Sequence, residues 1–296
     1  MPVALLLLIL TACGGGNSSS TPAGGPLTGN WQLNLVQEYP RPQTLLSVSG
    51  FLVEANNALT GSVQVPSVAS QNHCGGVSSL TGTVSSQSVA LSVNEGGSVL
   101  GFTGTISSDG KSMAGSYVAE GGSCFNISTT GTWTALLIPP LNGNFTGTLT
   151  SSSYMSLLTG VTPPAPIAVS GTINQGANAG ASNATLTGTI TAVGYPCFSS
   201  ATMSGTISGQ NVYLNIFDYK GDQIGTLGQP SGSAGTPGFP ATVVINGSAV
   251  SLVDANIDGL FLGIFTGTGE SGPCPPINNG SSTQTFDGVS TVFNFQ

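Results

Sequence analysis

The sequence predicts an all-β protein built from two related antiparallel units, and three features carry this prediction: alternating apolar residues, tight turns and an internal repeat. Val89, Leu91 and Val93 alternate with small or polar residues, which is the period of a strand with one buried face. Dipeptides such as Asp109-Gly110 separate these segments and supply the positive φ angles that tight hairpins need. Strands joined in order by tight turns form meanders, which close as barrels or stack as sandwiches.

The two halves of the chain contain the same landmarks in the same order. Leu80–Val93 and Met203–Ile216 share Gly, Thr, Ser, Gln, Val and Leu at matching positions. The sequence therefore predicts an internal duplication, with a boundary at Pro139-Pro140, where a strand would be interrupted. Further matched landmarks are Cys74 with Cys197, Gly29-Asn30-Trp31 with Gly143-Asn144-Phe145, Leu59–Val63 with Leu186–Ile190, and Glu120–Cys124 with Glu270–Cys274.

The amino-terminal apolar run Val3–Leu10 is too short to cross a bilayer, which takes about 20 apolar residues. A cleaved export signal explains it. The run leads into Leu10-Thr11-Ala12-Cys13, which resembles the lipobox of bacterial lipoproteins. The resemblance implies cleavage before Cys13, a diacylglycerol on the Cys13 sulfur, and fatty-acyl chains such as palmitate as the membrane anchor. It also implies a place in the bacterial envelope, at the outer rather than the inner membrane, facing the periplasm or the cell surface.

The predicted organisation has four parts: a signal peptide (1–12), the lipid-bearing cysteine with a Gly/Ser linker (13–26), a first β unit (27–138) and a second β unit (141–296). The linker has no apolar face to bury, which predicts a flexible tether. The second unit is longer, mainly through residues 229–240, which we expect to form a surface loop.

The composition limits the classes of partner. Only 5% of the residues are charged, with three Lys and Arg against 11 Asp and Glu, a net charge of −8. Binding to nucleic acid requires several cations to neutralise phosphates, so that class is excluded. The negative charge also disfavours attraction to anionic lipid, which leaves the acyl anchor as the predicted membrane contact. The 39% of hydrophobic residues can build a core of ordinary size.

The four cysteines that remain after Cys13 predict disulfides, because their number is even and the chain is exported. Spacing alone leaves three connectivities open. The repeat favours one bridge in each unit, Cys74–Cys124 and Cys197–Cys274. Each bridge would add roughly 4 kcal/mol by the chain-entropy estimate.

The opening Gly29-Asn30-Trp31, followed by Leu-Thr-Gly-Thr strands, is similar to the start of lipocalin-type and avidin-type barrels. The resemblance implies a calycin-like barrel, with other barrels and sandwiches as alternatives. The aromatic residues on strand-like segments are expected in the core, or as the lining of a pocket if the barrels are open. These residues are Trp31, Tyr117, Trp133, Phe145, Phe265 and Phe293.

Asp254, Asn256 and Asp258 match the first half of an EF-hand loop, in which alternate side-chain oxygens bind calcium. The twelfth position, where a bidentate Glu is needed, is Phe265. Asp258-Gly259 also stands where the first unit has the turn Asp109-Gly110. We therefore expect a turn and no metal site.

The other polar candidates do not form a catalytic constellation. Glu120 and Glu270 each precede a cysteine by four residues and could bind a cation or a hydroxyl group, but we expect solvated charges. His73 is the only histidine, so a site with several histidine ligands is excluded. Ser108–Lys111 fits a Ser-x-x-Lys pattern in a segment that predicts a turn, and no Gly-x-Ser-x-Gly nucleophile elbow occurs.

The sequence thus favours a non-catalytic envelope lipoprotein without a cofactor, which binds a small apolar or sugar ligand or another envelope component. The first alternative is a structural or adhesive surface module without a pocket. The second is an envelope hydrolase, which converging carboxylates would support.

Overall fold

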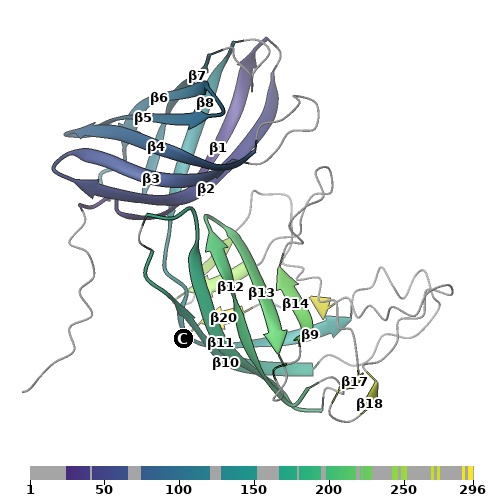
Figure 1. The fold of residues 1–296 in the computed structure, drawn as a ribbon. Helices are drawn as coiled ribbons and strands as arrows, with labels where there is room; N and C mark the ends of the chain where they lie inside the picture. Colours follow the sequence, from purple (N-terminus) through teal and green to yellow (C-terminus); the bar gives the residue numbers. More distant parts are fainter. Residues whose placement is uncertain are drawn as a thin grey trace, which may run out of the picture.

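The computed structural model describes residues 25–40, 42–65, 75–120, 128–151, 167–178, 180–194, 198–217, 221, 223–228, 242–245, 248–251, 268–269, 272–273, 289–290 and 293–295. These residues form strands and turns without a helix, which confirms the predicted all-β class (Figure 1). None of the described segments is an apolar helix of bilayer-spanning length.

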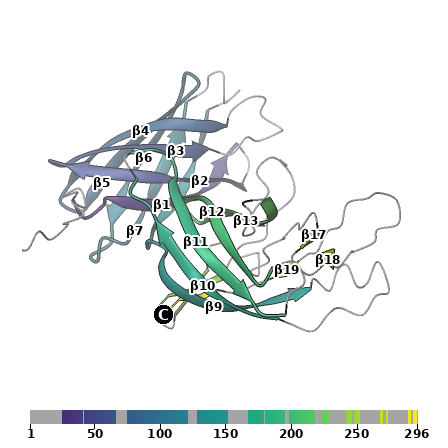
Figure 2. The ribbon, with the colours of Figure 1, turned by 60° about the horizontal axis from the view of Figure 1, so that its bottom comes forward.

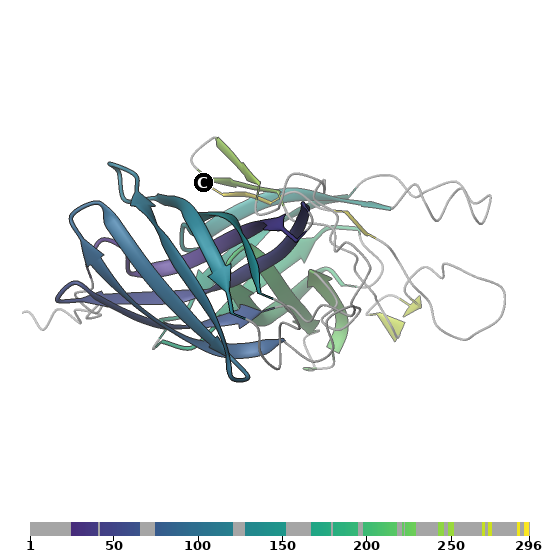
Figure 3. The same ribbon diagram turned by 90° about the horizontal axis from the view of Figure 1, so that it is seen from above.

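The first eight strands form one closed antiparallel barrel (Figures 1 and 3). Its closing pair is β1 with β8: Trp31 on β1 faces Gly50 of β2 on one side and Leu137 of β8 on the other. The sequence left open whether each unit is a barrel or a sandwich. The first unit is a barrel. The strands are β1 (Gly29–Tyr39), β2 (Gln43–Ala55), β3 (Ala58–Val65), β4 (Gly76–Ser85), β5 (Ser88–Glu95), β6 (Ser98–Ile106), β7 (Ser112–Ala119) and β8 (Thr129–Ile138).

One end of the barrel, which we call the closed end, carries the short turns after β2, β4 and β6 and is covered by residues 25–28. Leu27 is buried there: its amide donates to the Glu54 carboxylate (3.0 Å), and its carbonyl accepts from the Trp31 indole (2.9 Å). The other end, which we call the loop end, carries the turns after β1 and β5 and the long connections after β3 and β7. The closed end is therefore covered by the segment that precedes β1, whereas the loop end carries the longer connections between strands.

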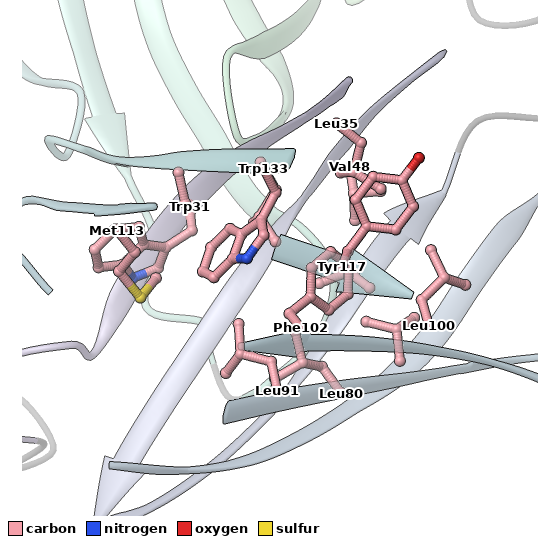
Figure 4. Packing of buried hydrophobic residues seen from close by; sticks show 14 of the residues in the cluster. Trp31, Leu35, Val48, Leu80, Leu91, Leu100, Phe102, Met113, Tyr117 and Trp133 are labelled. Atoms are coloured by element: carbon pink, nitrogen blue, oxygen red, sulfur yellow. The ribbon is translucent and has the colours of Figure 1, made fainter. Parts of the chain in front are cut away.

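The barrel interior is filled by apolar side chains from alternate positions of every strand, as the period of two predicts. The Trp133 ring meets the Phe102 ring edge-on at 5.4 Å, and its indole donates to the Thr103 carbonyl (3.1 Å). Figure 4 shows these rings with Trp31 and Tyr117 in the same core. The prediction that Trp31, Tyr117 and Trp133 are core residues is confirmed.

Glycines recur in the middle of the strands because neighbouring backbones approach closely there. Gly104 on β6 faces Gly115 on β7. A Cβ on Gly115 would clash with the Thr103 carbonyl oxygen, and one on Gly104 would lie 3.0 Å from the Trp133 ring. Glycine at these positions allows the tight coiling of a small barrel, and the Trp133 ring covers the gap.

The remaining strands belong mostly to a second sheet, in which β9 lies between β10 and β20. Its core contains Phe145, as predicted, together with apolar residues of β10 to β13. The strands are β9 (Asn142–Ser151), β10 (Ile167–Gln175), β11 (Ala184–Ala192), β12 (Ser200–Ser208), β13 (Asn211–Phe217), β14 (Gln223–Gly228), β15 (Thr242–Ile245), β16 (Ser248–Ser251), β19 (Val289–Ser290) and β20 (Phe293–Phe295); β17 (Thr268–Gly269) and β18 (Gly272–Pro273) pair apart from it.

The strand registers agree between the barrel and the second sheet. Trp31 faces Gly50 across β1 and β2, and Phe145 faces Gly171 across β9 and β10. The register also agrees between β3–β5 and β11–β13. Repeated sequence segments therefore occupy equivalent strand positions in the barrel and in the second sheet. The further pairs are Gly61 with Leu80 and Gly188 with Met203, then Gly82 with Leu91 and Gly205 with Leu214.

The second sheet packs against the outside of β1 and β2, where β12 contacts both strands (Figure 2). Phe51 of β2 points away from the barrel interior and is buried in the core of the second sheet, with Ile138 at the end of β8 and Leu141 from the connection between the units. The boundary predicted at Pro139-Pro140 lies between β8 and β9.

Candidate binding site at the loop end of the barrel

Five inward-facing side chains near the loop end of the barrel are polar, beside the apolar Val65 and Ala119, and we call these five the polar layer. They come from five different strands, and each is at most 8% exposed. The phenol of Tyr117 lies one step deeper, above Phe102. The members of the polar layer are Gln37 (β1), Ser78 (β4), Glu95 (β5), Ser98 (β6) and Thr129 (β8).

Strand period and register bring these residues together. Glu95 follows Val89, Leu91 and Val93 in the inward phase of β5, so its carboxylate enters the barrel with the apolar side chains. Ser98 faces Glu95 across the tight turn from β5 to β6. Apolar residues lie below the polar layer in the barrel interior, and we call the polar layer with this apolar base the polar cup.

Burial changes the acidities of two groups in the cup. Removal from water raises the pKa of the Glu95 carboxyl above its usual value, because the charged form loses hydration. Burial also raises the pKa of the Tyr117 phenol, and the negative charge of Glu38 adds to this shift. The cup therefore holds one carboxyl group that protonates more readily than a solvated one, and a phenol that stays protonated at neutral pH.

The long connections carrying two of the predicted disulfide cysteines start and finish at this same end. The segment with Cys74 joins β3 to β4, and the segment with Cys124 joins β7 to β8. Both cysteines lie outside the described residues. The same holds for the other predicted site residues Cys13, His73, Cys197, Asp254, Asn256, Asp258, Phe265, Glu270 and Cys274.

Two of the weaker candidates fall on described residues. Glu120 is exposed directly after β7, as expected of a solvated charge. Ser108–Lys111 forms the turn between β6 and β7, as expected: the Gly110 amide donates to the Ser107 carbonyl (2.9 Å), and φ of Gly110 is +70°. Hydrogen bonds from the Ser107 hydroxyl and the Lys111 amide lower the pKa of Asp109, which stabilises this turn.

The buried carboxylates were not among the residues singled out by motif. Glu95 and Glu54 each continue an inward-facing alternation, with Val93 and Leu52 respectively. The strand period could therefore have found them. Among the described residues, no three His, Cys, Asp or Glu side chains gather closely enough to hold a metal ion.

Comparison with known proteins gives no relative: the chain matches no protein-family model, no curated protein and no solved structure.

Proposed function

We propose that this protein is a non-catalytic lipoprotein of the bacterial envelope that binds a small hydroxyl-bearing ligand, such as a sugar, in the polar cup at the loop end of its barrel. The observation that carries the proposal is the polar layer, in which one carboxylate and several hydroxyl and amide groups face the barrel axis. Barrel mouths are common ligand sites, and a few polar groups on an apolar base fix the orientation of a bound molecule.

The chemistry of the cup favours a sugar over a wholly apolar ligand. The Glu95 carboxylate accepts hydrogen bonds, and the Ser98 and Thr129 hydroxyls both donate and accept them, which matches the groups of a sugar ring. The apolar layers below are filled by large rings, including Trp133 and Phe102. A ligand would therefore sit at the mouth.

The filled interior also favours the second candidate, a structural or adhesive module that acts through its outer surface. Trp133 and Phe102 are almost fully buried in the middle of the barrel, where a deep ligand pocket would need space, and Trp31 is buried toward the closed end. Mass spectrometry of the native protein from its host separates the two candidates, because only the first is expected to retain a ligand.

Glu95→Gln is expected to abolish stabilisation by neutral monosaccharides, because the carboxylate is the strongest acceptor in the cup. A sugar at 100 times its Kd would stabilise the wild-type protein by about 2.7 kcal/mol. Thermal unfolding with glucose, galactose and N-acetylglucosamine as probes measures this effect. Glu120→Gln, at an exposed carboxylate of the same barrel end, is the matched control and should keep it. Equal stabilisation of the wild type and Glu95→Gln would contradict the site.

The same variant tests the acidity of Glu95. Because its pKa is raised in the folded state, the folded protein keeps a proton that the unfolded chain has released. The stability of the wild type should therefore fall as the pH rises from the usual carboxyl pKa to the raised one. Without ligand, Glu95→Gln should be more stable than the wild type at neutral pH and should match it below this window.

The lipid anchor is a separate part of the proposal, supported by Leu10-Thr11-Ala12-Cys13. Cys13→Ser is expected to abolish labelling with a fatty-acid analogue and to move the protein from the membrane fraction to the soluble fraction. Unchanged fractionation of this variant would contradict the anchor.

The disulfide pairing Cys74–Cys124 also belongs to the proposal. The supporting observation is that the described strands on either side of each cysteine meet the loop end of the barrel. A bridge there would tie together the two long connections beside the polar cup.

A further inference from the structure

Polar groups buried at the closed end and at the centre of the barrel are hydrogen-bonded. The Trp31 indole donates to the Leu27 carbonyl (2.9 Å), and the Glu54 carboxylate accepts from the Leu27 amide (3.0 Å). At the centre, the Trp133 indole donates to the Thr103 carbonyl (3.1 Å). This is the usual condition of a folded protein, because a buried polar group without a partner has lost its hydrogen bonds to water and gained none.

Two hydroxyl groups at the loop end differ from these groups. Tyr117 is 2% exposed and Thr129 is 3% exposed. Neither hydroxyl has a hydrogen-bond partner within the part of the chain that the structure describes. Two buried hydroxyls of this kind reduce the stability of the fold, so their presence in the core calls for a reason other than stability.

The register brings the two hydroxyls to neighbouring places on β7 and β8. Tyr117 faces Gly131 across the two strands, and Thr129 is the next residue of the same inward phase toward the loop end. A Cβ on Gly131 would lie 2.8 Å from Tyr117 Cε1, so the glycine gives the phenol ring its place. In Figure 4 the Tyr117 hydroxyl points away from the Trp133 ring.

The chemistry of this pair suits a hydroxyl group of a ligand. A hydroxyl both donates and accepts, so one ligand hydroxyl can accept from one member of the pair and donate to the other. Tyr117 can donate at neutral pH, because burial raises the pKa of its phenol. The buried Ala119 faces Thr129 across β7 and β8, and it offers apolar contact to the carbon atoms of a ligand.

Binding at this place includes a local rearrangement, because both hydroxyls are closed off from solvent. A ligand reaches them only when side chains at the loop end move aside. The same step turns two unpaired hydroxyls into paired ones, so the stability that the free protein lacks is regained in the complex. Binding sites often keep groups that are unfavourable for stability in this way.

We propose that Tyr117 and Thr129 are ligand-binding residues that hold one hydroxyl group of a sugar between them at the base of the polar cup. This inference rests on the sugar-binding function proposed above and deepens it. The sugar would reach past the rim of the cup to Tyr117, and the two unpaired hydroxyls would be kept for recognition at the expense of stability.

The first test uses the protein without ligand. Tyr117→Phe and Thr129→Val each remove one hydroxyl and keep the shape of the side chain. Because the removed hydroxyl has no partner, the midpoint of urea unfolding should stay the same or rise in both variants. Tyr39→Phe, at a tyrosine of the same barrel end that is 63% exposed, is the matched control and should leave the midpoint unchanged. A lower midpoint in Tyr117→Phe or Thr129→Val would reveal a structural hydrogen bond and would overturn the inference.

The second test adds ligand. Thermal unfolding with glucose, galactose and N-acetylglucosamine gives the Kd of each sugar that stabilises the wild type. This Kd should rise about tenfold in Tyr117→Phe and in Thr129→Val, as expected for one lost hydrogen bond to the ligand, and should not change in Tyr39→Phe. One monodeoxy analogue of the same sugar should bind the wild type about tenfold more weakly than the intact sugar. Tyr117→Phe should bind the analogue and the intact sugar equally.

The sugar measurements separate this inference from the function on which it rests. If sugars stabilise the wild type, lose this effect in Glu95→Gln and keep it in full in Tyr117→Phe and Thr129→Val, only the inference is overturned. If no sugar stabilises the wild type, the proposed function is overturned and the inference with it.

Discussion

Trp133→Ala is expected to lower the free energy of unfolding by about 3–5 kcal/mol, the usual cost of removing a large aromatic ring from a core. The ring is almost fully buried, meets Phe102 edge-on at 5.4 Å, and covers the gap beside Gly104. Its loss would leave a cavity at the centre of the barrel and remove the hydrogen bond from the indole to the Thr103 carbonyl.

Urea unfolding followed by circular dichroism measures this effect. Leu136→Ala is the matched control, because Leu136 lies on the same strand, faces outward and is 48% exposed. The control should change the free energy of unfolding by less than about 1 kcal/mol, as is usual for surface positions. Similar losses in the two variants would mean that Trp133 does not anchor the core.

Phe51→Ala is expected to lower the free energy of unfolding by a similar amount, about 3–5 kcal/mol. Although Phe51 belongs to a barrel strand, the loss of stability should fall on the second sheet. The ring is 5% exposed and packs in the core that contains Phe145 and Ile207. Truncation would open that core on the side facing the barrel while leaving the barrel interior intact.

Hydrogen exchange resolves where the loss occurs. In Phe51→Ala, peptides from β11 to β13 should exchange faster, and peptides from β4 to β7 should not. Val77→Ala, at an outward-facing barrel residue that is 66% exposed, is the control and should change neither set. Faster exchange confined to the barrel would contradict the assignment of Phe51 to the second core. The same contact predicts that residues 141–296 expressed alone would be less stable than in the whole chain.

Local sequence patterns were sufficient to predict the strands and the turns. The alternation of Val89, Leu91 and Val93 marks a strand with one buried face, and Asp109-Gly110 marks the hairpin turn found between β6 and β7. The same alternation, followed one step further, leads to Glu95 inside the barrel. The repeat also implies that equivalent strands pair in the same register, and the structure places equivalent glycines opposite equivalent apolar residues in both units.

Contacts between residues far apart in the sequence could not be predicted from local sequence patterns. Asn30 and Gln32 alternate with the inward-facing Trp31 and Leu33, so the strand period assigns them to solvent. Their burial depends on the turn between β12 and β13, Ser208–Asn211, about 180 positions later in the chain. Closure of the barrel through β1 and β8 likewise joins the first and last strands of a unit, and no local signal specifies that pairing.

The cap at the closed end has a consequence for how the molecule is presented to its surroundings. Residues 25–28 leave the barrel there, and β8 also finishes at that end, since Ile138 faces Asn30. In the lipoprotein that we propose, the segment from Cys13 to Gly24 reaches at most about 40 Å from the bilayer. The lipid would therefore hold the barrel from its closed end, so that the polar cup lies at the end of the barrel opposite the tether. A captured molecule would then arrive from the aqueous side and not by diffusion within the lipid.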